Sequence, residues 1–164
     1  MATRAPSWSS TTTGTGGINS LATSSTWVAG YEWFIIDMAG YLDALIELTP
    51  MVGTTPTINT EIRAYLFPIG DGGTLYPDVF DGTPSAETVT SAGVRDSFAK
   101  LAGVGIVDST TSDRAYPMNF NVLSFFPTAP KKVGVFVAHN TGVNLNSTAG
   151  NQKYQYTLYT ETIT

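Results

Sequence analysis

Apolar and polar residues alternate with a period of two along most of the chain from Trp27 onward. Such alternation is typical of β-strands with one buried face, and loops rich in Gly, Pro and Asn separate the segments that show it. Seven segments fit this pattern, over residues 27–37, 41–49, 58–67, 97–107, 116–126, 132–140 and 153–163. The sequence therefore predicts an all-β protein with seven or eight strands.

The segment from Trp27 to Pro50 is the most apolar and aromatic part of the chain, so we expect the core to be built on it. Both alternating sets of its first strand are rich in apolar residues: Tyr31, Trp33 and Ile35 on one face, and Glu32, Phe34 and Ile36 on the other. A strand of this kind lies in the middle of a sandwich or contacts another subunit. Residues 41–49 also fit a helical face, but the short distance between Gly40 and Pro50 favours a strand.

Two connections carry further signals. Residues 70–84 form the longest one, and loops of this length in compact domains are often functional or pack under their own side chains. Four apolar residues of this loop can fold back on the body: Leu75, Tyr76, Val79 and Phe80. Within 97–107, Gly103 and Gly105 occupy the same face, which predicts a bulge or a close approach of another backbone.

Residues 1–25 have the composition of a linker and no hydrophobic period, so we expect an extended N-terminal arm followed by a single domain over residues 26–164. Trp8 is the one large aromatic residue of this arm. A large amphipathic ring gains free energy from burial, so we expect Trp8 to dock on the body or on a neighbouring subunit.

The strand pattern predicts an antiparallel β-sandwich. Long connections favour a jelly-roll or Greek-key topology over an immunoglobulin-like one, whose Cys-Trp-Cys signature is absent. The 164 residues include no cysteine, so stability must come from packing and hydrogen bonds rather than disulfides.

The charge pattern argues against nucleic-acid binding. The net charge is −5, the eight basic residues are scattered, and only 13% of residues are charged against about 25% in average soluble domains. Polar character comes from hydroxyl and amide groups instead, a composition suited to surfaces that touch other protein. The first residues lack the apolar stretch of a secretory signal and no run approaches the roughly 18 apolar residues of a membrane span, so we expect a soluble protein made in a cytoplasm.

Candidate catalytic and metal-binding residues are few. His139 is the single histidine and has no evident partner, so we interpret it as structural rather than catalytic. Asp71, Asp78 and Asp81 could in principle bind calcium, but their spacing matches no EF-hand and Asp-Gly pairs are more often turn chemistry. We predict neither an enzyme nor a bound cofactor or metal.

Two other constellations have a structural explanation. Of the paired carboxylates, Glu32 and Asp37 should face opposite sides of one strand, whereas Asp43 and Glu47 share a solvated face. Four aromatic residues could form a sugar-stacking platform, although sandwich cores use the same residue types: Trp8, Trp27, Tyr31 and Trp33.

From Ile18 to Tyr159, the chain resembles a family of small virion proteins of tailed bacteriophages. Short strings at turns and strand ends carry the resemblance: Asn19–Ala22, Val28–Glu32, Tyr76–Asp78 with Asp81–Thr83, Ser112–Pro117, His139–Gly142 and Asn144–Thr148. The resemblance implies a β-sandwich that decorates or cements the outside of a capsid. A tail- or head-fibre module that binds host-surface glycans is the alternative.

If the resemblance holds, the partners are the major capsid protein and further copies of this chain, in a dimer or trimer, without nucleic acid, membrane or small-molecule substrate. The arm and the first strand would then supply the interface, through Trp8, Ile18, Leu21, Trp27, Tyr31 and Trp33. Tyr76 and Phe80 would add contacts from the long loop. The family offers no catalytic residues to carry over.

Overall fold

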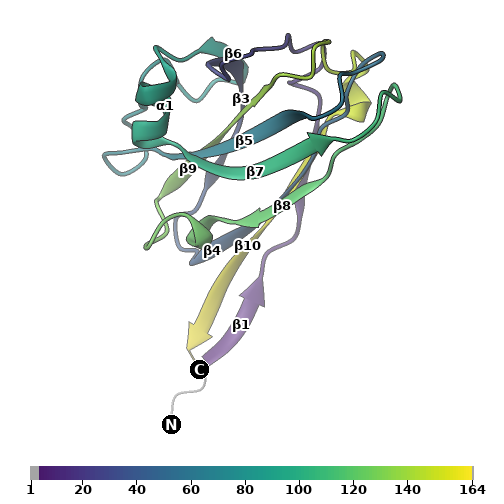
Figure 1. Ribbon diagram of the computed structural model, residues 1–164. Helices are drawn as coiled ribbons and strands as arrows, with labels where there is room; N and C mark the ends of the chain where they lie inside the picture. Colours follow the sequence, from purple (N-terminus) through teal and green to yellow (C-terminus); the bar gives the residue numbers. More distant parts are fainter. Residues whose placement is uncertain (1–3, 164) are drawn as a thin grey trace.

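The computed structural model describes residues 4–163, which form two antiparallel sheets packed face to face (Figure 1). This arrangement confirms the prediction of an all-β sandwich. The first sheet contains β1 (Arg4–Trp8), β2 (Thr12–Thr15), β4 (Asp43–Thr49), β8 (Met118–Asn121) and β10 (Lys153–Ile163). The second contains β3 (Ala29–Asp37), β5 (Thr60–Pro68), β6 (Ser85–Thr88), β7 (Lys100–Val107) and β9 (Lys132–His139).

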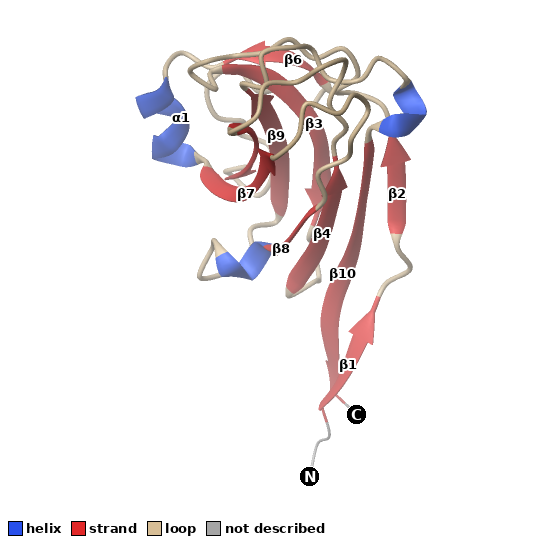
Figure 2. Cartoon of the chain, turned by 45° about the vertical axis from the view of Figure 1, so that its right-hand side comes forward, coloured by secondary structure: helices blue, strands red, loops and turns tan. Residues whose placement is uncertain are grey.

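Among the described strands, the chain changes sheet at six of the nine connections between successive strands (Figure 2). In the first sheet the order is β1-β10-β4-β8, and β2 also pairs with β10; in the second it is β6-β3-β9-β5-β7. From β2 to β5 successive strands alternate between sheets, and they do so again from β7 to β10. Only the passage from β5 through β6 and the helix α1 (Ala92–Phe98) to β7 stays in the second sheet.

The structure contains three strands that were not predicted, β1, β2 and β6, and it differs from the sequence prediction at two strand ends. The segment 97–107 was expected to be a strand throughout, but Ser97 and Phe98 belong to α1, which starts because the Ser91 hydroxyl accepts a hydrogen bond of 3.1 Å from the amide of Val94. In 116–126, β8 ends at Asn121 and the 3-10 helix η1 (Val122–Ser124) follows. The other predicted strands lie within a few residues of those observed.

A β-bulge in β3 overturns the expected faces of this strand. The pairing of β3 with β9 shifts between Glu32 and Phe34, because Trp33 is an extra residue. As a result Trp33 and Phe34 both join the core between the sheets, whereas Ile35 packs on the opposite, outer face of the second sheet. Glu32 and Asp37 therefore share a face, contrary to the prediction.

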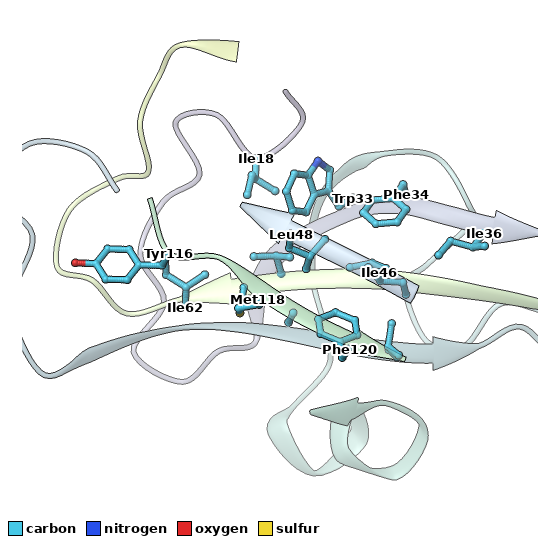
Figure 3. Close-up of a cluster of buried hydrophobic side chains, with 14 of the residues drawn as sticks. Ile18, Trp33, Phe34, Ile36, Ile46, Leu48, Ile62, Tyr116, Met118 and Phe120 are labelled. Carbon is cyan, nitrogen blue, oxygen red and sulfur yellow. The ribbon is translucent and has the colours of Figure 1, made fainter. Parts of the chain in front are cut away.

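The main core lies between the two sheets, where apolar side chains from both inner faces interdigitate (Figure 3). Ile36, Ile46, Leu48 and Ile62 are completely buried there. Stacked rings join the sheets at one side, with Phe34 3.9 Å from Tyr154 between ring centroids. Between residues 4 and 163 no helix is long and apolar enough to cross a membrane.

A second apolar cluster covers the outer face of the second sheet. Phe67 and Phe136 project from the sheet and pack against Phe80 of the loop 70–84 and Phe98 of α1. The loop thus folds back on the body through Phe80 and the half-buried Tyr76, as expected, but Leu75 stays 66% exposed. The long loop therefore completes a core.

Candidate binding surface at the base of the arm

β10 extends beyond the sandwich and carries β1 with it. Its residues from Lys153 to Tyr159 pair with β4 on one side, but among the described residues the last four pair with β1 alone. Figures 1 and 2 show the resulting two-stranded ribbon leaving one end of the body, with Arg4 and Ile163 paired at its described tip. We call this ribbon, residues 4–8 with 159–163, the arm.

Two aromatic rings pack against each other at a tilted angle where the arm leaves the body. Trp8 and Tyr159 are directly opposite each other in the strand pair, and their ring centroids are 4.9 Å apart. The Tyr159 hydroxyl donates a hydrogen bond of 3.1 Å to Glu161. Loss of solvent and then the Glu161 carboxylate raise the pKa of the Tyr159 hydroxyl, so it stays neutral at neutral pH. Trp8 remains 55% exposed, so one face of the pair is open to a partner.

Two exposed leucines lie on segments that follow Tyr159 across the first sheet: Leu42 just before β4, and Leu123 in η1 after β8. The amide of Leu42 donates a hydrogen bond of 2.8 Å to the carbonyl of Tyr159. The Asp43 carboxylate accepts hydrogen bonds from the amide of Leu123 and the side chain of Asn121, both at 3.0 Å, which fixes η1 beside the start of β4. Trp8, Leu42, Leu123 and Tyr159 together are called the arm-base cluster.

The arm-base cluster offers exposed apolar surface on an ordered support. Leu42 and Leu123 are 46% and 41% exposed, and the backbone bonds just described hold both in place. Large exposed apolar side chains on neighbouring segments are the kind of surface at which proteins interact. The one ion pair on the described part of the arm, Arg4 with Glu161 at 3.3 Å, is exposed and adds little stability. The surface is therefore suited to contact another protein rather than to perform chemistry.

The structure places the other expected interface residues of the arm and first strand in the body. Ile18 and Trp33 are 0% and 2% exposed, and Leu21 is also buried in the main core. The indole N–H of Trp33 donates a hydrogen bond of 2.8 Å to the carbonyl of Gly16, which ties the end of the predicted arm to β3. These side chains are explained by packing within one chain. Met1–Thr3, also part of the predicted arm, lie outside the described residues.

The remaining aromatic candidates are dispersed over the body. Trp27 packs on the outer face of the second sheet, where the Arg63 guanidinium lies 3.7 Å from its ring centroid. The hydroxyl of Tyr31 donates a hydrogen bond to the carbonyl of Pro84. Trp8, Trp27 and the buried Trp33 are thus on different parts of the molecule, and they form no common sugar-stacking platform.

Sequence reasoning missed Leu42, Leu123 and Tyr159. Leu42 falls within the predicted strand 41–49, but β4 begins one residue later, at Asp43. Leu123 was assigned to the strand that instead gives way to η1. Tyr159 could have been found, because the alternation of the last strand places it on the opposite face from Leu158, which packs against the core.

His139 is completely buried and bonded within the chain. One ring nitrogen is 2.9 Å from the carbonyl of Leu21 and the other 3.0 Å from the hydroxyl of Thr141. Desolvation lowers the pKa of His139, which favours the neutral ring. The histidine therefore ties the segment before β3 to the end of β9, in agreement with a structural role.

Two acidic residues of the long loop, Asp78 and Asp81, accept hydrogen bonds from threonines of the same chain. The Asp78 carboxylate accepts hydrogen bonds from the amide and the hydroxyl of Thr90, and Asp81 accepts one from the amide of Thr83. Over residues 4–163 no three acidic or histidine side chains are close enough to hold a metal ion. Turn chemistry accounts for these aspartates.

A shallow groove of about 350 Å³ crosses the outer face of the first sheet. Its polar lining includes Thr13, Thr15, Glu47, Asn119, Lys153 and Gln155. The side chains of Glu47 and Gln155 are hydrogen-bonded to each other. This face thus differs from the outer face of the second sheet, which apolar residues cover.

No family model and no curated protein sequence matches the chain.

Proposed function

We propose that this chain is a structural protein of a tailed-bacteriophage particle that binds the capsid shell through the arm and the arm-base cluster. The observation that carries the proposal is the two-stranded arm, which leaves the body with large apolar side chains exposed at its base. The assignment to a phage particle rests on the resemblance of the turn and strand-end strings.

The geometry of the arm supports a role in assembly. A ribbon of two strands is marginally stable alone, so an arm of this kind gains order from the surface on which it lies. Trp8 supplies the kind of large aromatic anchor that dominates binding energy at protein interfaces. Copies repeated by the symmetry of a shell would turn individually weak contacts into firm attachment.

The strand order supports the jelly-roll type within the sandwich class. With β1 and β6 set aside, the two sheets have the orders β2-β10-β4-β8 and β3-β9-β5-β7, and the first and last of these strands, β2 and β10, are neighbours in one sheet. Such an order arises when a long antiparallel hairpin wraps around a core, and jelly rolls are frequent in viral capsid domains. The topology therefore agrees with the proposed role, although fold alone does not establish function.

Substitution of Trp8 by Ala tests the proposal. We expect occupancy on purified particles to fall strongly, because the exposed ring is lost while the body keeps its packing. Ile58 is the matched control, since it is 48% exposed and precedes β5 at the far end of the second sheet from the arm. Occupancy equal to wild type for Trp8→Ala, or equal losses for Trp8→Ala and Ile58→Ala, would refute the role of the arm-base cluster.

The groove on the first sheet favours a second candidate function, which is glycan binding by a fibre module. Amide, carboxylate, ammonium and hydroxyl groups line it, and such groups can hydrogen-bond to sugar hydroxyls. Glycan-array binding that is lost in Glu47→Ala, with particle occupancy unchanged in Trp8→Ala, would favour this function over shell binding.

A further inference from the structure

The second sheet ends in a strand with an open edge. β7 pairs with β5 from Thr60 opposite Val107 to Leu66 opposite Lys100, and within residues 4–163 no strand pairs with its other edge. An open edge presents backbone donors and acceptors that can pair with another strand. β7 is therefore a candidate surface for strand addition.

The backbone direction in β5 shows which residues of β7 face the open edge. The N–H and C=O of Glu61 both bond to Asn140, on the β9 side. Since backbone groups alternate in direction along a strand, those of the next residue, Ile62, point toward β7 and its partner Gly105. The same alternation in β7 directs the N–H and C=O of Val104 and Ile106 to the open edge.

Large apolar side chains line the outer face of β7. Leu101, Val104 and Ile106 are 44%, 40% and 60% exposed. Gly103 and Gly105 take the inner positions, where a β-carbon would lie 3.1 Å from Met118 and 3.0 Å from Tyr116. The close approach of these side chains keeps β7 close to β8 with its apolar residues turned outward. The register shift at Ala102 in the pairing with β5 confirms the bulge that the glycines predicted.

The other sheet edges are protected in ways that β7 is not. β6 and β8 have four residues each, and β1 contains Pro6 and is separated from β2 by three residues. Short strands, proline and interruptions are the usual means of blocking an edge. β7 has eight residues, no proline, and no charged residue from Leu101 to Val107.

We propose that β7 pairs antiparallel with β7 of a second copy about a two-fold axis at Val104. A second copy is inferred as the partner because the apolar side chains of β7 are arranged symmetrically about Val104. Ala102 is an extra residue in the pairing with β5, so Leu101 and Ile106 are each two pairing positions from Val104. The axis therefore brings Ile106 of one copy opposite Leu101 of the other.

The charged residues at the two ends of β7 also favour a second copy of the chain as the partner. Lys100 and Asp108 flank the apolar stretch, and both are exposed. With Ala102 counted as the extra residue, Lys100 is three pairing positions from Val104 and Asp108 is four, so a two-fold axis at Val104 brings the lysine of each copy within one position of the aspartate of the other, where opposite charges favour the antiparallel pairing. The pairing uses the second sheet and does not depend on the arm, so the two proposals fail independently.

Sedimentation velocity over a wide range of concentration tests the pairing. We expect the wild-type chain to dimerise and Val104→Lys to raise the dimer dissociation constant by at least about tenfold, because two ammonium groups would meet at the axis. Leu75→Lys is the control, since Leu75 is also an exposed apolar residue. A wild-type chain that is monomeric throughout, or equal dimerisation by folded Val104→Lys, would overturn the proposal.

Crosslinking through a single introduced cysteine gives a second test, which is specific for the register with residue 104 of each copy opposite the other. The chain has no cysteine, so a thiol at residue 104 can form a disulfide only between copies. Directly opposite residues of a hydrogen-bonded pair have Cα atoms about 5.5 Å apart, which suits a disulfide. Val104→Cys should therefore crosslink much faster than Ile58→Cys on mild oxidation. Equal rates would overturn the two-fold at Val104.

Charge exchange tests the flanking pair. Lys100→Glu and Asp108→Lys should each weaken dimerisation, and the double variant should restore it, because the opposite charges then meet in exchanged positions. Asp108 also contacts Arg114 at 3.0 Å, an exposed pair that contributes little to stability. Failure of the double variant to restore the dimer, while both single variants weaken it, would contradict the proposed register.

Discussion

β10 is one continuous strand, yet its two halves have different surroundings. From Lys153 to Leu158 it lies between β4 and the N-terminal strands, and its inward side chains pack against the main core. Its last four residues pair with β1 alone within the described chain. Backbone hydrogen bonds of the same kind run through both halves, so burial is the main difference between them.

The inner half of β10 contributes to the stability of the fold, whereas the outer half is available to contact another protein. Burial of apolar side chains is the dominant favourable term in folding, and the inner half of β10 has it whereas the outer half does not. The body should therefore supply nearly all of the stability. The arm can vary in sequence or position at little cost to the body, which suits a segment whose proposed role is to contact another protein.

The largest expected effect on the free energy of unfolding comes from a substitution on the outer face of the second sheet, which α1 and the loop 70–84 cover. Phe67 is completely buried, stacks on Phe80 at 4.3 Å, and lies directly over the backbone at Gly134. Phe67→Ala should lower the free energy of unfolding by about 3–5 kcal/mol, measured by urea denaturation, because it leaves a cavity under the long loop. The exposed control Leu75→Ala should change it by less than about 0.5 kcal/mol. A loss below about 1 kcal/mol in Phe67→Ala would show that this second cluster is not part of the stable body.

Acidification should lower the free energy of unfolding through His139, a residue of the body, and the arm should not contribute to this loss. Desolvation lowers the pKa of His139 below 6.5, so the unfolded chain binds more protons than the folded one below that pH. Stability should then fall as pH decreases, with a slope of at most about 1.4 kcal/mol per pH unit for one proton. Denaturation between pH 7 and 5 should show this slope in wild type and in Trp8→Ala but not in His139→Gln. Equal slopes in all three proteins would contradict the prediction.

Glu32 should act in the opposite direction. Its side chain is buried beside the loop, and burial raises its pKa although the amides of Asp81 and Gly82 donate hydrogen bonds to it. The nearby carboxylates of Asp81 and Glu87 add to the increase. Between pH 4.5 and the raised pKa, the folded chain binds more of this proton than the unfolded one, so stability falls as pH rises. Glu32→Gln should remove this contribution, and an unchanged pH profile would refute it.

The sequence predicted the body better than the arm. Alternation identified β5, β9 and β10 because each has a buried face, and the apolar set of β10 ends at Leu158, where the sandwich ends. The bulge at Trp33 could not be predicted, because an extra residue in a strand that is apolar on both faces leaves no break in the pattern. The arm-base cluster depends on which segments meet in space, so of its members only Trp8 was predicted, and only Tyr159 could have been added, from the alternation of the last strand.

The smallest expected effect on stability comes from the arm, and hydrogen exchange separates it from the body. Amides of residues 160–163 and of β1 should exchange through local opening with a free energy near zero, whereas those of residues 154–158 should approach the global value. Trp8→Ala should speed exchange in the arm and change the global free energy of unfolding by less than about 0.5 kcal/mol, because the ring is more than half exposed. If both halves of β10 exchanged at the same rate, the arm would be a cooperative part of the body. The arm would then be ordered before it binds a partner, and binding would not increase its order.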